Sequence, residues 1–350
     1  MNDIIMADTL QIIMDNDMSK LKNSTFLITG ASGMVGKYLV NVLLTLNEKY
    51  NMNIKIIALV RNISKLEDYI INNMNVKIIN QDVINPINVT EDIDYIINTA
   101  SPASPIIMKD KPFETNIANT VGTYQTIKLA IKKKCKCYVY ISSREIYGQP
   151  AEGQTQFYEN GPLGQVDPLI PRNGYAEGKK AAENMCVSAH DEYKLNTKII
   201  RLAHTYGPGM SINDGRVQAD FLRNIIRKEN IIMKSDGSSV RTYTYIADAV
   251  NAIFKVLLNG KDIVYNVSNI KDKTTIKDLA LLLIKISGED IKLIVNIENN
   301  QKGTASFTNG ILNSDKIIKE LNWKPLYSME NGFKRTIEYL KSIEGVQNNG

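Results

Sequence analysis

Short apolar stretches rich in β-branched residues alternate with helical patterns from Thr25 onward, and this alternation restricts the fold more than any other feature. It is typical of a parallel sheet covered by helices on both faces. The predicted strands are 25–29, 55–59, 76–80, 95–98, 137–142, 198–202 and 264–268, and the predicted helices are 34–47, 116–132, 175–193, 218–227, 246–258 and 276–286. The sequence therefore predicts an α/β fold with a doubly wound parallel sheet and a smaller C-terminal lobe.

A glycine-rich loop follows the first predicted strand and begins the first helix of the alternation. Glycine is needed where such a loop turns tightly, where its backbone approaches a pyrophosphate, and where the helix packs on the strand. The pattern therefore predicts a Rossmann-type dinucleotide site. The predicted contacts are Gly30, Ser32, Gly33, Met34, Val35 and Gly36.

The acid that usually binds the adenosine ribose at the end of the second strand is absent, and Arg61 stands there. Arginine suits the 2′-phosphate of NADP, but it can also stack on the adenine or lie exposed on the surface. From this residue, NAD and NADP both stay open. Asp82 and Val83 follow the third strand, where the aspartate can accept a hydrogen bond from the adenine amino group; it is also a common turn residue.

Three further segments are predicted to meet at the carboxyl ends of the strands. Tyr175 and Lys179 lie four residues apart on one helical face, where an ammonium can lower the pKa of the phenol. The phenolate would then take the proton of a substrate hydroxyl while hydride leaves the same carbon, and Ser143 would hydrogen-bond that oxygen. This pattern indicates oxidation of an alcohol with a nicotinamide cofactor.

These motifs together resemble the extended short-chain dehydrogenases/reductases of the nucleotide-sugar epimerase/dehydratase family, over residues 22–339. Within that family the pattern is similar to that of UDP-glucuronate decarboxylases, also called UDP-xylose synthases. The stretches that carry the closer similarity are 100–105, 119–123, 171–172, 175–179, 207–210, 213–217 and 236–241.

The resemblance implies that a bound nicotinamide oxidises the sugar at C4, and that the ketone then permits decarboxylation or inversion before the hydride returns. It implies Ser143, Tyr175 and Lys179 as the redox triad and Glu145 as a second acid/base. It favours NAD, a UDP-sugar substrate, and a homodimer through helices 116–132 and 175–193. The implied cofactor contacts also include Thr99, Ala100, Ser101, Asn119, Tyr175 and Lys179, and the implied substrate contacts are Ser104, Arg144, Arg172, Asn173, His204, Arg216, Val217, Met233 and Arg241.

Three departures from the family pattern bear on the reaction. Arg144 stands where 4,6-dehydratases carry an acid, and a guanidinium cannot protonate the C6 leaving group, so elimination at C6 is not expected. His204 replaces an asparagine that contacts substrate, and it is either a ligand residue or a packed strand-end histidine. The tyrosine that follows the Ser-Pro-Ala-Ser-Pro stretch of decarboxylases is missing at 106–108.

The reaction therefore stays open among decarboxylation, 4-epimerisation and net oxidation or reduction at C4. Arg144 and Arg172 favour decarboxylation if they pair with a substrate carboxylate. A non-catalytic nucleotide-binding scaffold is the distant alternative. Such a protein would be expected to lose Tyr175, Lys179 or the glycines, and all of them are present in this sequence.

Composition and charge restrict the partners. With 43% hydrophobic and 23% charged residues, the chain is not disordered, collagen-like or disulfide-rich. The net charge of +5 is spread over 350 residues, so we expect no nucleic-acid partner. No apolar stretch approaches the roughly 20 residues of a membrane span, and 1–22 lacks the positive region of a signal peptide, so we expect a cytoplasmic protein without a membrane partner. Buried thiols, and no metal site, are predicted for Cys135, Cys137 and Cys186.

The alternation loosens after His204, which predicts a division of the chain. Residues 148–173 contain glycines and prolines with little periodicity and are predicted to be a loop or lid. We expect an N-terminal helical extension at 1–22, a dinucleotide-binding Rossmann domain at 23–203 plus about 243–270, and a nucleotide-sugar-binding lobe at about 204–242 plus 271–345.

Overall fold

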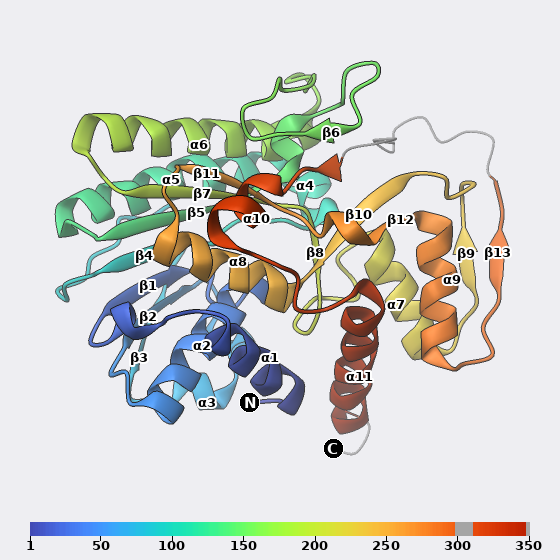
Figure 1. The fold of residues 1–350 in the computed structure, drawn as a ribbon, viewed down its shortest axis with the longest axis horizontal. Coiled ribbons are helices and arrows are strands. Elements are labelled where there is room, and N and C mark those ends of the chain that lie inside the picture. Colours follow the sequence, from blue (N-terminus) through green and yellow to red (C-terminus); the bar gives the residue numbers. More distant parts are fainter. Residues whose placement is uncertain (298–310, 348–350) are drawn as a thin grey trace.

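The structure is a computed structural model that describes residues 1–297 and 311–347, and a seven-stranded parallel sheet forms its centre (Figure 1). In spatial order the strands are β3 (Val76–Asn80), β2 (Lys55–Val60), β1 (Thr25–Thr29), β4 (Tyr95–Asn98), β5 (Cys137–Ser143), β7 (Thr197–Leu202) and β11 (Val264–Val267). Every neighbouring pair is parallel. The predicted α/β fold is confirmed, and each predicted strand agrees with the observed one to within one residue at each end.

Helices cover both faces of this sheet. On one face lie α5 (Pro112–Lys133) and α6 (Gly174–Tyr193), and on the other lie α2 (Met34–Tyr50) and α8 (Ile246–Asn259) (Figure 1). Successive side chains of a strand point to opposite faces. Leu27 of β1 therefore belongs to the core under α5 and α6, whereas its neighbours Phe26 and Ile28 belong to the core under α2 and α8.

The N-terminal helix α1 (Asp3–Met14) packs on the body through buried side chains, one of which is the carboxylate of Asp8. Asp8 accepts hydrogen bonds from the hydroxyls of Tyr38 at 2.9 Å and Tyr245 at 2.7 Å. Arg335 of α11 (Met329–Gln347) donates to the other oxygen of Asp8 at 2.5 Å. Asp8 therefore links the first and last helices of the chain to the middle of the molecule.

A second group of elements lies beside the sheet. β8 (His204–Tyr206) pairs in parallel with β10 (Val240–Tyr245), which pairs antiparallel with β12 (Lys273–Thr275). Two small parallel pairs are β9 (Ile231–Met233) with β13 (Leu293–Val295), and β6 (Gln156–Phe157) with β14 (Ile311–Leu312). The other α-helices are α3 (Asp68–Ile71), α4 (Pro105–Asp110), α7 (Val217–Arg227), α9 (Ile276–Ser287) and α10 (Asp315–Leu321). Several of these elements are only two to four residues long, which is too short for a hydrophobic period in the sequence.

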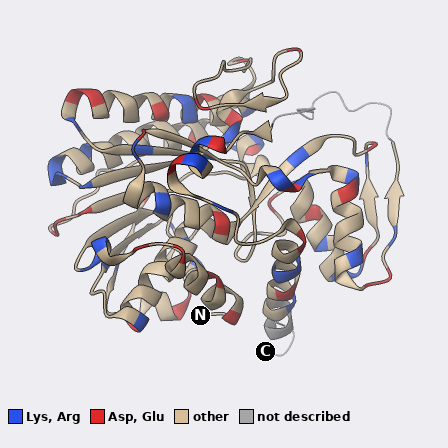
Figure 2. Cartoon of the chain, viewed as in Figure 1, with Lys and Arg blue, Asp and Glu red and all other residues tan. Residues whose placement is uncertain are grey.

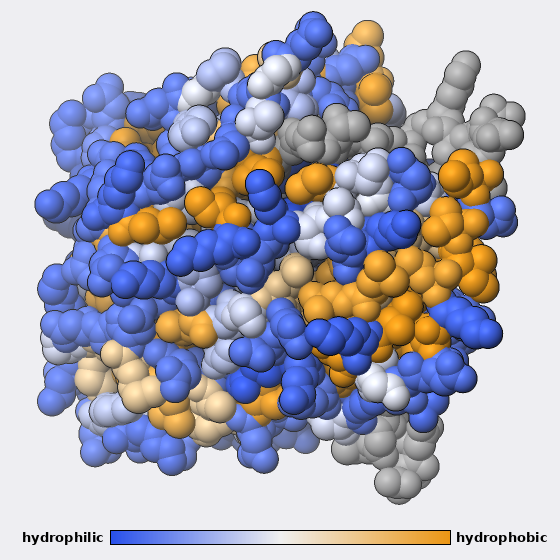
Figure 3. Space-filling model, turned by 45° about the vertical axis from the view of Figure 1, so that its right-hand side comes forward, coloured by the Kyte–Doolittle hydropathy of each residue, from blue (hydrophilic) through white to orange (hydrophobic). Residues whose placement is uncertain are grey.

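The surface mixes charges of both signs: Figure 2 shows basic and acidic residues interspersed over the helices and loops. Figure 3 shows one apolar area over β9, β13 and α9, where the exposed residues are Ile232, Leu281, Ile294 and Val295. No helix in the described ranges is both long enough and apolar enough to span a membrane. The three cysteines are buried free thiols, as predicted. Among the described residues, no cluster of His, Cys, Asp or Glu could hold a metal ion.

Candidate active site

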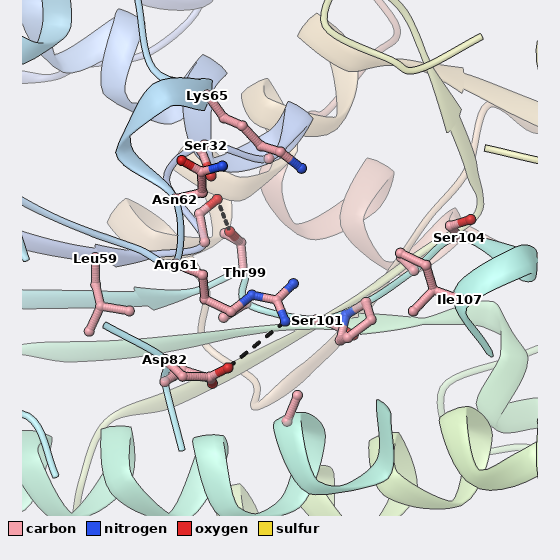
Figure 4. A pocket seen from close by; sticks show the side chains of 17 residues that line it. Ser32, Leu59, Arg61, Asn62, Lys65, Asp82, Thr99, Ser101, Ser104 and Ile107 are labelled. Atoms are coloured by element: carbon pink, nitrogen blue, oxygen red, sulfur yellow. Dashed lines mark hydrogen bonds and ion pairs between the residues drawn. The ribbon is translucent and has the colours of Figure 1, made fainter. Parts of the chain in front are cut away.

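A cavity of about 550 Å³ opens at the carboxyl ends of β1, β2, β3 and β4 (Figure 4). Because β1 lies between β2 and β4, the strand order reverses here, and doubly wound folds bind their ligands at this point. Nine of the predicted cofactor contacts line it: Gly30, Ser32, Gly33, Arg61, Asp82, Val83, Thr99, Ala100 and Ser101. The other lining residues are Ser104, which was predicted to contact substrate, and Leu59, Asn62, Lys65, Pro102, Ala103, Ile107 and Ala118, which were not predicted.

The glycine loop forms the wall of this cavity at the start of α2. Gly30 has a φ of +64°, and a Cβ there would lie 2.9 Å from the Cα of Ala100. A Cβ at Gly36 would collide with the carbonyl oxygen of Gly30. Gly33 is the N-cap of α2 and supplies no side-chain cap, so the first N–H groups of a 17-residue helix are left for other acceptors. This cradle fits the phosphates of a dinucleotide.

The remaining predicted residues of the loop do not line the cavity. Met34 and Val35 lie in the first turn of α2 and are packed against the core, and Gly36 is buried behind the loop. The side chains of Met34 and Val35 therefore hold the helix in place beneath the cradle.

Tyr175, near the start of α6, is buried and makes side-chain hydrogen bonds with Ser143 and Ser101. Ser101 lines the cavity and also donates to the Asn119 side-chain oxygen at 2.8 Å. Ser101 thus connects the cavity to the phenol. Burial raises the pKa of Tyr175, and the hydrogen bonds with Ser143 and Ser101 oppose that rise. The sequence predicted a lowered pKa for Tyr175, and this prediction is wrong in this structure. Desolvation of the phenolate raises the pKa by more than the bonds with Ser143 and Ser101 lower it.

Lys179 lies one turn after Tyr175, as its spacing predicts. Its Nζ is 5.8 Å from the centre of the Tyr175 ring and 4.7 Å from that of Tyr140, and it donates to the carbonyl oxygen of Ile141 at 2.7 Å. Burial lowers the pKa of Lys179 to about 7, and the carboxylate of Glu183 opposes this effect. Both protonation states are therefore populated near neutral pH, which suits a group that passes protons.

A buried hydrogen-bond network that was not predicted supports the pair from behind. Glu183, one turn after Lys179, accepts from Ser142 Oγ at 2.5 Å and pairs with Arg201 Nη2 at 2.7 Å. Arg201 also donates to the hydroxyl of Tyr147 at 2.6 Å. Because Ser142 precedes Ser143, the network fixes the strand end that carries the serine. In the sequence, this hydrogen-bond network is indicated only by the position of Glu183, four residues after Lys179.

Glu145 lies in the 3-10 turn η3 (Arg144–Tyr147) directly after Ser143. Its backbone N–H donates to Ser143 Oγ at 3.1 Å, and its Oε2 is 3.5 Å from Nη1 of Arg172. The negative charge of Glu145 contributes to the raised pKa of Tyr175. The second predicted acid/base is therefore close to the predicted base.

Positive charge gathers around this glutamate. Arg144 is buried, with its guanidinium carbon 6.0 Å from the centre of the Phe157 ring. Burial lowers the pKa of Arg144 to about 10; Glu145 opposes this, and Arg241 and Arg172 act in the same direction as burial. Three guanidinium groups thus act on one another across a partly buried space, an arrangement that favours an anionic ligand.

His204 faces the same charges from the start of β8, and its ring centre is 5.7 Å from that of Tyr243 on β10. Burial holds the pKa of His204 well below its ordinary value, and Arg144, Arg241 and Arg216 act in the same direction. Its Nδ1 is buried without a hydrogen-bond partner in the described structure. His204 is therefore an uncharged imidazole with one buried nitrogen that has no hydrogen-bond partner in the described structure.

Arg216 is bonded to the segment that lines the end of the cavity where Figure 4 shows Ser104 and Ile107. It pairs with Asp214 at 2.6 Å and donates to the carbonyl oxygen of Ala103, while Ser104 Oγ donates to the carbonyl oxygen of Asp214 at 2.7 Å. These bonds join the loop before α7 to the segment after β4.

Three residues that were predicted to contact the substrate instead contact other parts of the protein: Val217, Met233 and Asn173. Val217 and Met233 pack against the apolar core. Asn173 donates from its side chain to the carbonyl oxygen of Asp167 at 2.9 Å.

Comparison with known proteins agrees with this geometry. Residues 26–268 match the model of the NAD dependent epimerase/dehydratase family. UDP-glucuronic acid decarboxylase 6 of Arabidopsis thaliana is 29% identical over 94% of this chain and 94% of its own length. UDP-glucuronic acid decarboxylase 1 of Xenopus tropicalis is 28% identical over 95% of this chain and 76% of its own.

Among solved structures, UDP-glucose 4-epimerase with UDP-glucose from Thermotoga maritima superposes with a TM-score of 0.78 at 24% identity, covering 91% of this chain and 99% of that one. At this identity the likeness shows the shared fold. The family match spans the seven strands of the large sheet, the glycine loop and the Tyr175–Lys179 pair. The resemblance seen in the sequence is thereby confirmed, and the chain belongs to the NAD-dependent epimerase/dehydratase family.

Proposed function

We propose that this protein oxidises C4 of a nucleotide-linked sugar with a nicotinamide dinucleotide, and that its substrate is a UDP-linked uronate, which it decarboxylates. The observation that carries the proposal is the gathering of Arg144, Arg172 and Arg241 around Glu145, next to Tyr175. A uronate brings a carboxylate and a diphosphate, and guanidinium groups pair with both.

The cofactor would be held by the glycine loop, with its phosphates at Ser32, Gly33 and the first turn of α2. When bound, it supplies an acceptor for the hydride of sugar C4 and a donor for the return of that hydride. Thr99 and Ala100 line the same cavity and face the loop, since the Thr99 hydroxyl donates to the carbonyl oxygen of Thr29 at 2.6 Å.

Tyr175 takes the proton of the C4 hydroxyl in the first step. Ser143 hydrogen-bonds the phenol and holds the substrate oxygen as the C4 carbonyl forms. Lys179, whose pKa burial lowers to about 7, then receives the proton that leaves the phenol. The same groups return the proton when the carbonyl is reduced again.

The 4-keto uronate is a β-keto acid, which explains why oxidation precedes carbon loss. The bond from C5 to the carboxylate breaks, its electron pair enters the enolate of the C4 carbonyl, and carbon dioxide leaves. Solvent then supplies one proton to C5 through Glu145, which lies 3.5 Å from Arg172. Arg172 and Arg144 pair with the carboxylate beforehand, while Arg216 and Arg241, in the proposed substrate lobe, pair with the diphosphate.

The relatives support this choice of reaction. Both curated relatives described above are named as UDP-glucuronic acid decarboxylases and match over nearly the whole of this chain. We also propose a homodimer through α5 and α6, which expose Tyr124 and Val187 on their outer faces.

The test is to incubate the purified protein with a panel of nucleotide sugars and to measure product mass and reduced nicotinamide together. The proposal expects a product lighter than UDP-glucuronate by one carbon dioxide, with no net gain of reduced cofactor. An unchanged mass with altered chromatographic retention would replace it with epimerisation. Stoichiometric reduced cofactor would replace it with net oxidation at C4.

A further inference from the structure

The cavity has an unusual lining where it passes the end of β2. This strand ends at Val60, and the next residues that line the cavity are Arg61, Asn62 and Lys65. In dinucleotide-binding folds, a carboxylate at this position accepts hydrogen bonds from the 2′-hydroxyl of the adenosine ribose. Here the position offers two basic side chains, one of which, Lys65, was not singled out in the sequence.

The chain after β2 holds Lys65 at the cavity by a local cap. The Asn62 side-chain oxygen accepts from the backbone N–H of Ser64 at 2.9 Å and from its hydroxyl at 2.8 Å. This cap starts the 3-10 turn η2 (Ile63–Lys65), and the turn brings Lys65 back to the cavity four residues after Arg61. Figure 4 shows Asn62 and Lys65 on the side of the cavity where Ser32 of the glycine loop lies. In the described ranges, Lys65 makes no ion pair with an acidic side chain.

Arg61 reaches across the cavity toward Asp82, as Figure 4 shows. Its Nη1 is 3.9 Å from Asp82 Oδ2, and the two side chains are 63% and 33% exposed. An ion pair as exposed as this one contributes little to stability, which leaves the guanidinium able to bind another anion. Asp82 is also held by the backbone N–H of Ile84 at 3.2 Å. It therefore orients Arg61 without neutralising the second cation, Lys65.

We propose that this site takes the 2′-phosphorylated dinucleotide, NADP, in preference to NAD, and that Arg61 and Lys65 hold the 2′-phosphate. The planar guanidinium binds two phosphate oxygens, and the ammonium supplies a second charge from the opposite side. The resemblance to NAD-dependent relatives favours NAD; the placement of Lys65 and the absence of an acid at the end of β2 favour NADP. The inference rests on the proposed function only in that the cavity must bind a dinucleotide.

Calorimetric titration of NADP and NAD into the full-length protein tests this, because it measures binding without turnover. The wild type is expected to bind NADP at least about tenfold more tightly than NAD. Arg61→Ala and Lys65→Ala should each weaken NADP by about ten- to a hundredfold, the loss of one charge-assisted contact, and should change NAD by less than about threefold. Lys49→Ala is the matched control, since that exposed lysine of α2 pairs with Glu48 and is not among the residues that line the cavity.

Tighter binding of NAD by the wild type, or equal weakening of both dinucleotides in the variants, would overturn the inference and leave the dinucleotide site standing. Binding of neither dinucleotide by a folded protein would overturn the proposed function as well. Arg61 and Lys65 are exposed residues in turns, so the two alanine variants are expected to fold. An unchanged midpoint of thermal unfolding would verify that they do.

Discussion

The burial of Lys179 in the candidate active site predicts how the stability of the protein depends on pH, and this can be tested without substrate. Burial lowers the pKa of Lys179 to about 7, from an ordinary value of 10.5. Between those two values the unfolded chain holds more protons on this side chain than the folded chain does. The free energy of unfolding must therefore rise with pH across this range. A group with this shift adds about 2–3 kcal/mol of stability between roughly pH 6 and pH 9.

Replacement of Lys179 by methionine removes this pH dependence. The substitution also loses the hydrogen bond to Ile141, but that loss is the same at both pH values. The quantity to compare is therefore the change in unfolding free energy between pH 6 and pH 9, from urea titrations followed by circular dichroism. The wild type should gain about 2–3 kcal/mol more than Lys179→Met over this interval.

Lys180→Met is the matched control, because the next side chain along α6 is partly exposed and pairs with Glu177 at 3.1 Å. It should keep the pH dependence of the wild type. If Lys179→Met keeps that dependence as well, Lys179 is charged in the folded protein throughout the range, and its assignment as a proton-passing group is refuted.

Three other changes have defined outcomes. Gly33→Val should abolish dinucleotide binding in calorimetry, because its side chain would fill the cradle at the start of α2; unchanged affinity in a folded variant would contradict the cradle. Asp8→Ala should cost about 3–5 kcal/mol in urea unfolding, because it leaves Arg335 and two buried hydroxyls without their acceptor; a cost below about 1 kcal/mol would show that the link is unimportant. The wild type is expected to sediment as the proposed dimer, and Tyr124→Glu combined with Val187→Glu should convert it to monomer; a monomeric wild type or an unchanged dimer in the variant would contradict this interface.

The large sheet could be predicted because its strands carry a strong signal. Each is a short run of buried apolar residues, and the helices between them have a clear period. The short strands β6, β8, β12 and β14 were missed because two or three residues have no period to detect. Their stability comes from the packing of distant segments, such as the pairing of β6 with β14.

The candidate site could be predicted only in part, for a similar reason. The spacing of Tyr175 and Lys179 indicates that they share a helical face, but it carries no information on burial. The predicted direction of the shift in the Tyr175 pKa was therefore wrong. Lys65 and Glu183 were overlooked because an exposed lysine in a turn and a glutamate in a helix are ordinary in a sequence. Their importance depends on where the cap at Asn62 and the ion pair with Arg201 place them.

The central claim is that Tyr175 begins the reaction as the general base, taking the C4 hydroxyl proton while the nicotinamide would accept the hydride, and that Glu145 acts after it. Single-turnover absorbance of the nicotinamide, measured with UDP-glucuronate alongside product mass, separates these roles. Tyr175→Phe should slow nicotinamide reduction by about 10²–10⁴-fold, because the general base is gone. Glu145→Gln should leave nicotinamide reduction in place and lower the yield of the final product, because the proton for C5 is no longer supplied through this carboxyl group. If Glu145→Gln abolishes nicotinamide reduction as completely as Tyr175→Phe does, the two-stage account is contradicted, and Glu145 belongs to the oxidation step.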